Sequence, residues 1–172
     1  MIISDEWWQT LEEAAKIVEV DISDIKPVKK KKLSDVVVLK SGKDWRSLNM
    51  GNIPVYGSGG EMGVFVDKVI YDKPTVLIPL RGTMDNVYYL DKPFWNVDTT
   101  FHTEINTEII LPKYLYYYLS NFDLKSICTG SGRLGTTKGK IENIKIVIPP
   151  LNIQKHIIEF LDNYSCIIGS SK

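Results

Sequence analysis

A succession of short segments between residues 53 and 111 constrains the fold more than any other feature of the sequence. These segments, which include VYGSGG, GVFVDKVIY, TVLIPL, NVYYL and FHTEI, are rich in valine, isoleucine, tyrosine and threonine, residues that favour strands. Glycine, asparagine, aspartate and proline, which form turns, separate them. The spacing predicts a meandering, mostly antiparallel sheet.

Helical periods flank this predicted sheet. Apolar side chains between residues 111 and 122 recur three and four positions apart, which predicts a helix over 113–122 with Pro112 at its entrance. The stretch IKIVIPP predicts a strand over 144–148 that ends at the prolines. The apolar stripe of residues 151–168 is typical of a helix that packs on its own domain or forms a short coiled-coil seam.

The first thirty residues differ from the rest. Residues 4–20 predict an amphipathic helix with Trp7 and Leu11 on one stripe, and 21–32 read as a connector. We therefore expect an α+β fold: a curved, mostly antiparallel mixed sheet with flanking helices, plus amphipathic N- and C-terminal helices. The length of 172 residues fits one domain, 31–150, preceded by a helix and basic linker, 1–30, and followed by a helical segment, 151–172.

Cysteine content and hydropathy bound the cellular setting. Two cysteines are too few for a disulfide framework, which favours a reducing, cytoplasmic location. The first residues lack the cationic and apolar regions of a signal peptide, and no run approaches the roughly 20 apolar residues of a membrane span. We therefore expect no contact with a membrane.

The net charge of zero conceals an uneven distribution. Residues 1–24 carry seven acidic side chains and one basic one, whereas 25–46 carry eight basic and two acidic, and 125–145 carry five basic and one acidic. Local positive potential attracts phosphate whatever the average charge. The two basic segments predict nucleic-acid binding, and a solvated linker is the alternative for Lys29–Lys32.

The stretch TGSGRLGTTKGK contains a G-x-G-x-x-G pattern, Gly130, Gly132 and Gly135, which is typical of dinucleotide-binding loops. Such a loop leaves a buried strand and begins a helix that holds the pyrophosphate. Here the pattern follows a helical period, and no acidic residue follows at the spacing that binds a ribose. We expect instead that the glycines let backbone amides approach phosphate closely.

The sequence signatures of catalysis are missing. It contains no P-loop, no histidine–cysteine spacing for zinc, no paired carboxylates beside a lysine, and no asparagine-proline-proline motif of a DNA methyltransferase. We therefore expect a binding module that is not an enzyme and uses no metal or cofactor.

Three stretches carry a family resemblance in their order and spacing. They are NIPVYGSGGEMG, TVLIPLRGTMDNVYYLDKPFWNVDTTFHTE and GSGRLGTTKGKIENIKIVIPPLNIQKHIIEFLD. Together they resemble the target recognition domain in the DNA-specificity (S) subunit of type I restriction–modification enzymes, over roughly residues 31–164.

This resemblance implies a domain over 31–150 that reads one half of a bipartite DNA site and has no catalytic activity. In the family two such domains stand apart on antiparallel helical spacers, and two methyltransferase subunits clamp around them. Residues 151–172 would begin such a spacer. The implied partners are double-stranded DNA, a methyltransferase (M) subunit and, as a further candidate, the translocase-nuclease (R) subunit.

Side-chain chemistry and loop position, rather than the family, indicate the DNA contacts. Arginine bidentate to guanine is the commonest specific contact, so Arg46, Arg81 and Arg133 are the leading base readers. A surface or core role is the alternative for each position, His102 in particular. The expected DNA contacts are Lys40, Lys43, Arg46, Tyr56, Ser58, Arg81, Thr83, His102, Ser131, Arg133, Thr137, Lys138 and Lys140. The expected contacts with a partner or a second copy are Trp7, Leu11, Ile153, Ile157, Phe160 and Tyr164.

The chain also departs from the family pattern, because a standard S subunit carries two recognition domains and two long helices. It is either a half-subunit that forms a homodimer and reads a palindromic bipartite site, or a fragment that folds without bridging two methyltransferases. Two other functions stay open. One is a methyltransferase-binding decoy, an antirestriction protein that reads no DNA, and the other is a nucleotide-dependent enzyme that uses Gly130–Gly135.

Overall fold

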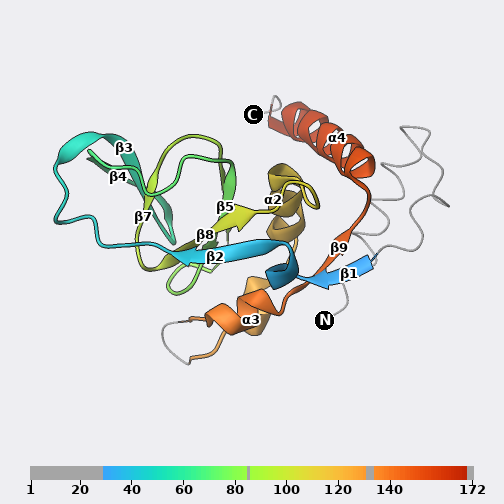
Figure 1. Ribbon diagram of the computed structural model, residues 1–172, viewed down its shortest axis with the longest axis horizontal. Coiled ribbons are helices and arrows are strands. Elements are labelled where there is room, and N and C mark those ends of the chain that lie inside the picture. Colours follow the sequence, from blue (N-terminus) through green and yellow to red (C-terminus); the bar gives the residue numbers. More distant parts are fainter. Residues whose placement is uncertain (1–28, 85, 131–133, 170–172) are drawn as a thin grey trace.

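The computed structural model describes residues 29–84, 86–130 and 134–169 (Figure 1). In chain order the elements are β1 (Lys29–Lys32), η2 (Leu33–Asp35), β2 (Val37–Ser41), β3 (Met50–Gly57), β4 (Gly60–Val66), β5 (Thr75–Pro79), β6 (Tyr88–Leu90), β7 (Trp95–Asn96), β8 (Thr100–Ile105), α2 (Pro112–Ser120), η3 (Leu124–Ile127), α3 (Lys138–Glu142), β9 (Lys145–Ile148) and α4 (Leu151–Gly169). The expected α+β class is confirmed, although the strands form three sheets rather than one. The helix expected over 4–20 lies outside the described residues.

The central sheet contains four antiparallel strands in the order β2-β8-β5-β6. The inner strand β5 is buried along its whole length, which explains the apolar sequence TVLIP. Thr75 is tolerated there because its hydroxyl donates to the carbonyl oxygen of Thr103 at 2.7 Å. The Thr103 hydroxyl in turn accepts the Val76 backbone N–H at 3.0 Å, so both buried hydroxyls are satisfied.

A smaller sheet, in the order β4-β3-β7, forms a lobe at one end of the molecule (Figure 1). β3 pairs antiparallel with β4 and parallel with β7, which makes the sheet mixed, as expected. This lobe has a separate small core of Val55, Val66 and Trp95. The loops that join the lobe to the central sheet include residues 42–49.

A two-stranded ribbon at the other end contains β1 and β9, which run antiparallel from the Lys29–Ile148 pair to the Lys32–Lys145 pair. The strand expected over 144–148 is confirmed as β9. The connector interpretation of residues 29–32 was wrong, because these lysines form β1. The buried side chains of Ile146 and Val147 hold β9 in the domain, and its free backbone edge pairs with β1. Lysine suits an exposed edge strand, because its charge discourages further pairing.

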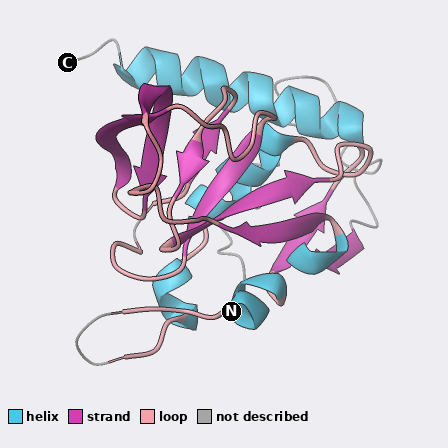
Figure 2. Ribbon diagram, turned by 60° about the vertical axis from the view of Figure 1, so that its left-hand side comes forward, coloured by secondary structure: helices cyan, strands magenta, loops and turns pink. Residues whose placement is uncertain are grey.

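The helices α2 and α4 cover the main core, and Figure 2 shows α4 across one whole side of the molecule. α2 begins at Pro112 and buries Tyr114, Leu115, Tyr118 and Leu119, which confirms the helical period in the sequence. None of the helices in the described part of the chain is long and apolar enough to cross a bilayer.

Fully buried Gln154 fixes the first turn of α4. Its Oε1 accepts the backbone N–H of Leu111 at 2.8 Å, and its Nε2 donates to the carbonyl oxygens of Ile109 at 2.9 Å and Pro149 at 2.8 Å. The amide side chain therefore joins α4 to the segment that enters α2. A second junction lies further along, where Lys113 Nζ pairs with Asp162 at 2.6 Å.

Candidate nucleic-acid interface

The end of the glycine-rich loop is fixed against the chain that leaves β5. Arg81 and Gly135 form an isolated antiparallel bridge, in which the Gly82 N–H donates to Leu134 O at 3.2 Å. The Thr136 N–H donates to Leu80 O at 2.9 Å. These bonds hold Arg81 beside the loop, and its side chain is exposed. The structure thus brings together two sites that lie more than fifty residues apart in the chain.

Of the two glycines of the G-x-G-x-x-G pattern that the structure describes, Gly130 has a structural reason to be glycine. Gly130 has a φ of 116°, a conformation that side chains disfavour. Gly135 exchanges two backbone hydrogen bonds with Thr129, at 2.8 and 3.2 Å. The loop follows the short helix η3 and leads to α3, which has five residues. This order lacks the strand before the loop and the long helix after it that a dinucleotide site requires.

Helix α3 carries three expected phosphate contacts. Thr137 caps its N-terminus, where the hydroxyl accepts the Lys140 N–H at 3.4 Å. Lys138 pairs with Glu142 at 3.6 Å, whereas exposed Lys140 makes no ion pair with any of the described residues. Ser131 and Arg133 lie outside the described residues.

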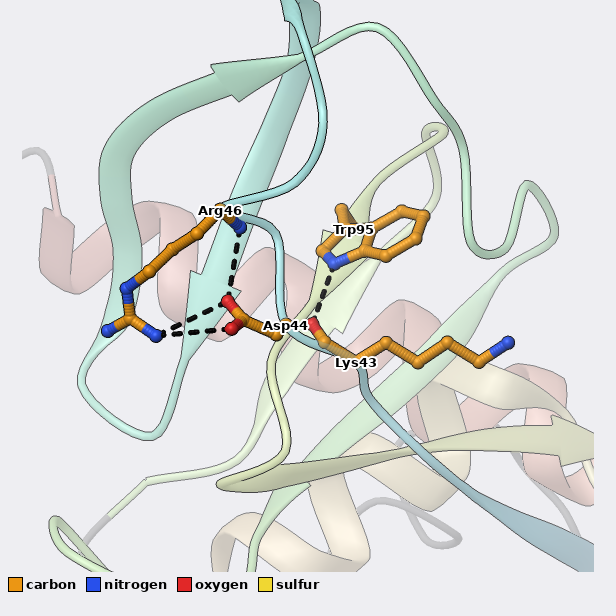
Figure 3. A network of polar contacts seen from close by, with 4 residues as sticks. All are labelled: Lys43, Asp44, Arg46 and Trp95. Carbon is orange, nitrogen blue, oxygen red and sulfur yellow. Dashed lines mark hydrogen bonds and ion pairs between the residues drawn. The ribbon is translucent and has the colours of Figure 1, made fainter.

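A second group of expected contacts lies on the loop between β2 and β3 (Figure 3). The loop is fixed at its base, because Lys43 N–H donates to Asn96 O at 2.9 Å and Trp95 Nε1 donates to Lys43 O at 2.8 Å. Gly42 is required there, since a Cβ would lie 2.2 Å from the Val97 carbonyl oxygen. The exposed side chains of Lys43 and Arg46 therefore project from a backbone that is held in place.

Asp44 orients Arg46 within this loop. Its Oδ1 accepts the Arg46 backbone N–H at 3.1 Å, and the Arg46 Nη1 donates to Oδ1 at 3.3 Å and to Oδ2 at 3.4 Å (Figure 3). The backbone hydrogen bond and the guanidinium charge of Arg46 lower the pKa of Asp44, so the carboxylate stays ionised. Sequence reasoning missed Asp44, although an acid two positions before a candidate base reader was a visible signal.

The remaining polar candidates lie on and between the sheets. Half-buried Tyr56 donates its hydroxyl to Glu61 at 3.3 Å, and burial and this carboxylate raise the pKa of Tyr56, so it stays protonated. Lys40 on β2 forms an ion pair with Glu104 on the neighbouring strand β8, at 3.6 Å. Ser58 lies half-buried in the turn between β3 and β4, and Thr83 is exposed beyond Arg81.

His102 belongs to the interior rather than to the surface. Its side chain is 4% exposed, its Nδ1 lies 2.9 Å from Asn96 Oδ1, and its ring stacks on Tyr71 at a centroid distance of 5.0 Å. Burial lowers the pKa of His102, which favours the neutral ring. We therefore remove His102 from the expected DNA contacts, because its position in the middle of β8 places it in the core.

The stripe of α4 also faces inward. Ile153 and Ile157, expected at a partner contact, are 4% and 5% exposed and belong to the main core. Phe160 is half-buried, and the side chain of Tyr164 is outside the described residues, as are Trp7 and Leu11. The apolar period of α4 is thus explained by packing on its own domain, one of the two interpretations of the sequence.

The protein is an α+β domain with exposed arginines and lysines on loops. Backbone hydrogen bonds hold these loops against the rest of the domain. Such an arrangement suits the phosphates and base edges of nucleic acid. Among the described residues, no three histidine, cysteine, aspartate or glutamate side chains gather as a metal site would require.

The chain belongs to the family of type I restriction modification DNA specificity domains, whose family model matches residues 25–171. It is 29% identical over 160 residues to a type I restriction enzyme specificity subunit of Haemophilus influenzae, which covers 90% of this chain and 36% of the relative. It is 25% identical over 163 residues to the MjaVIII specificity subunit of Methanocaldococcus jannaschii, with 77% and 38% covered. The chain therefore spans less than two-fifths of the length of either relative.

Solved structures with this fold come from the same family. The S subunit of a type I restriction-modification system from M. genitalium superposes with a TM-score of 0.70 at 16% identity, over 81% of this chain and 40% of that one. The HsdS subunit from Thermoanaerobacter tengcongensis gives 0.70 at 16% identity, over 98% and 45%. The family model and the relatives confirm the resemblance found in the sequence, and the solved structures agree with it in fold.

Proposed function

We propose that this chain is a sequence-specific DNA recognition module, a single-domain or half-length specificity subunit that directs a methyltransferase or nuclease partner to its site. Membership of the DNA specificity domain family supports this proposal, as do relatives named as specificity subunits. The observation that carries it is the pair of fixed loops with exposed cations, at Lys43–Arg46 and at Arg81–Gly135. The module itself does no catalysis and needs no cofactor.

Recognition is divided between α3, which contacts phosphates, and the two fixed loops, which read bases. Lys140 and Thr137, on and before α3, contact phosphates and set the register of the domain on the duplex. Arg46 and Arg81 are the base readers, because a guanidinium can donate two hydrogen bonds to one guanine. Arg46 lies on a loop whose base at Lys43 is hydrogen-bonded to β7, and Arg81 is bridged to Gly135, so little backbone freedom is lost on binding.

The coverage of the relatives bears on assembly. A chain that matches 36% and 38% of two specificity subunits supplies one recognition unit, and a bipartite site requires two. A homodimer provides the second unit by two-fold symmetry and then reads a palindromic site. The M subunit is the proposed principal partner, with the R subunit joining for cleavage.

Electrophoretic mobility shift across a salt series tests this function, with the chain alone and together with an M subunit from the same source. We expect binding to duplex DNA with an affinity that falls steeply as the salt concentration rises. Association with the M subunit without any affinity for DNA would favour the decoy function instead. Binding of NAD, FAD or ATP in calorimetry would revive the enzymatic alternative, which the loop geometry disfavours.

A further inference from the structure

The β1–β9 ribbon places two lysines directly opposite each other. Lys32 and Lys145 are Cα partners at one end of the ribbon, and both side chains are exposed. Like charges in this position repel, so the pair destabilises the ribbon unless an anion lies between or above them. Lys30, on the same strand, is also exposed.

The acids nearest in sequence do not neutralise this pair. Asp35 accepts the backbone N–H of Lys32 at 2.9 Å, and Glu142 pairs with Lys138 at 3.6 Å. The salt bridges among the described residues involve neither Lys32 nor Lys145. The two ammonium groups therefore present their charge to solvent.

The ribbon adjoins the proposed phosphate contacts along the chain and in space. The Leu33 N–H donates to Ile144 O at 2.8 Å, which ties the end of β1 to the chain two residues past the end of α3. Residues 135–145 thus run from the bridge with Arg81, through Lys140, to the Lys32–Lys145 pair. Figure 1 shows α3 at the lower edge of the molecule and the ribbon between α3 and the start of α4, with β9 leading from one toward the other.

The length of this segment suits a duplex. A five-residue helix rises about 8 Å and five extended residues add at most about 17 Å. The upper limit of about 25 Å corresponds to roughly seven base-pair steps, at about 3.4 Å of axial rise each. Within this limit, cations along the segment can follow one phosphate backbone beyond the bases that the arginines read.

We propose that Lys32 and Lys145, with Lys30 beside them, form a second phosphate-binding site that holds the duplex flanking the recognition sequence. This inference rests on the proposed function and extends it to residues with no part in base reading. The site adds affinity without sequence preference, because phosphates are the same at every base pair. An alternative use of lysine in an edge strand is to prevent aggregation, and the test separates the two.

The test measures the salt dependence of binding for the full chain and a mixed-sequence duplex of about 30 base pairs. The double substitution Lys32→Gln with Lys145→Gln removes two proposed phosphate contacts. The slope of log affinity against log salt becomes shallower by about 1.8, since each contact contributes about 0.9. Between about 50 and about 200 mM salt, wild-type affinity then falls roughly 12-fold further than that of the variant.

Two control variants make the result specific. Lys155→Gln removes an exposed charge from α4, which follows the Lys29–Ile148 end of the ribbon rather than the Lys32–Lys145 end, and leaves the slope unchanged. Lys32→Arg with Lys145→Arg keeps both charges and retains the wild-type slope. Circular dichroism melts confirm that each variant folds.

An unchanged slope in the glutamine variant overturns this site. Aggregation of that variant with an unchanged slope assigns the lysines to edge protection. Failure of the wild type to bind at low salt overturns the recognition function as well.

Discussion

Asp44 orients the side chain of Arg46. A carboxylate beside a DNA-binding loop repels phosphate, so its presence requires a compensating benefit. The benefit proposed here is orientation, because Asp44 holds both the backbone and the guanidinium of Arg46. Both side chains are well exposed, so this ion pair adds little to the stability of the fold, and its effect belongs to binding.

Replacement Asp44→Ala is therefore expected to change affinity and specificity in opposite directions. Affinity for mixed-sequence DNA rises, since a negative charge is lost, while discrimination at one base pair falls, since Arg46 is no longer oriented.

Arg46→Lys keeps the charge but loses the bidentate geometry, which costs about 1–3 kcal/mol of discrimination at that base pair. Sequencing of duplexes selected from a randomised library measures the base preference of each variant, and mobility shift with a mixed-sequence duplex measures the affinity. Unaltered base preference in both variants would remove Arg46 from the base readers.

Buried His102 predicts how stability depends on pH. Its pKa in the folded chain is lowered from 6.5, first by burial and then by Lys40, with Glu104 opposing the shift. As pH falls below about 6.5 the unfolded chain takes up this proton before the folded chain does, so the free energy of unfolding decreases. The variant His102→Gln lacks this component, and its stability changes less over the same range. Urea unfolding at several pH values compares the two proteins; parallel curves would contradict the assignment.

At the scale of elements, Gln154 connects α4 to the segment that enters α2. Replacement Gln154→Ala leaves the Leu111 N–H and two carbonyl oxygens without partners, and is expected to cost about 3 kcal/mol of unfolding free energy. Asn152→Ala, at an exposed position two residues before Gln154 on the same helix, serves as the control. It changes the free energy of unfolding by under about 0.5 kcal/mol. Equal effects in chemical denaturation would show that the buried amide does not stabilise the junction.

Elements with a strong period could be predicted from the sequence. Pro112, the stripe of α2 and the strand before the double proline each give a local signal, and all three are present in the structure. β1 could not be predicted, since four lysines have no strand pattern of their own and acquire one only by pairing with β9, more than a hundred residues away. His102 illustrates the same limit, because its burial depends on Asn96 and Tyr71.

At the scale of the whole molecule, the class and family were accessible from the sequence, while the division into three sheets was not. Turn residues mark where strands end, but they do not say which strands pair. The candidate site was likewise predictable only in part. Arginines on loops were visible in the sequence, whereas the bridge between Arg81 and Gly135, the role of Asp44 and the Lys32–Lys145 pair depend on contacts between distant segments.

Assembly is also decided at this scale. If the chain is a dimerising half-subunit, sedimentation equilibrium of the full chain with DNA gives two chains per duplex, and the selected sites are palindromic with a fixed spacing. One chain per duplex and a single undivided half-site would instead indicate that one recognition unit acts alone.

Selection of binding sites from a randomised duplex library, with the full chain and its M subunit, shows whether the domain reads a DNA sequence. A specific module retains a small set of related sequences after competition at physiological salt, because base contacts survive where non-specific phosphate binding weakens. We expect one enriched motif that contains guanines and loses its preference at those positions in the Arg46→Lys and Arg81→Lys variants. Recovery of a library with the composition of the input would contradict it.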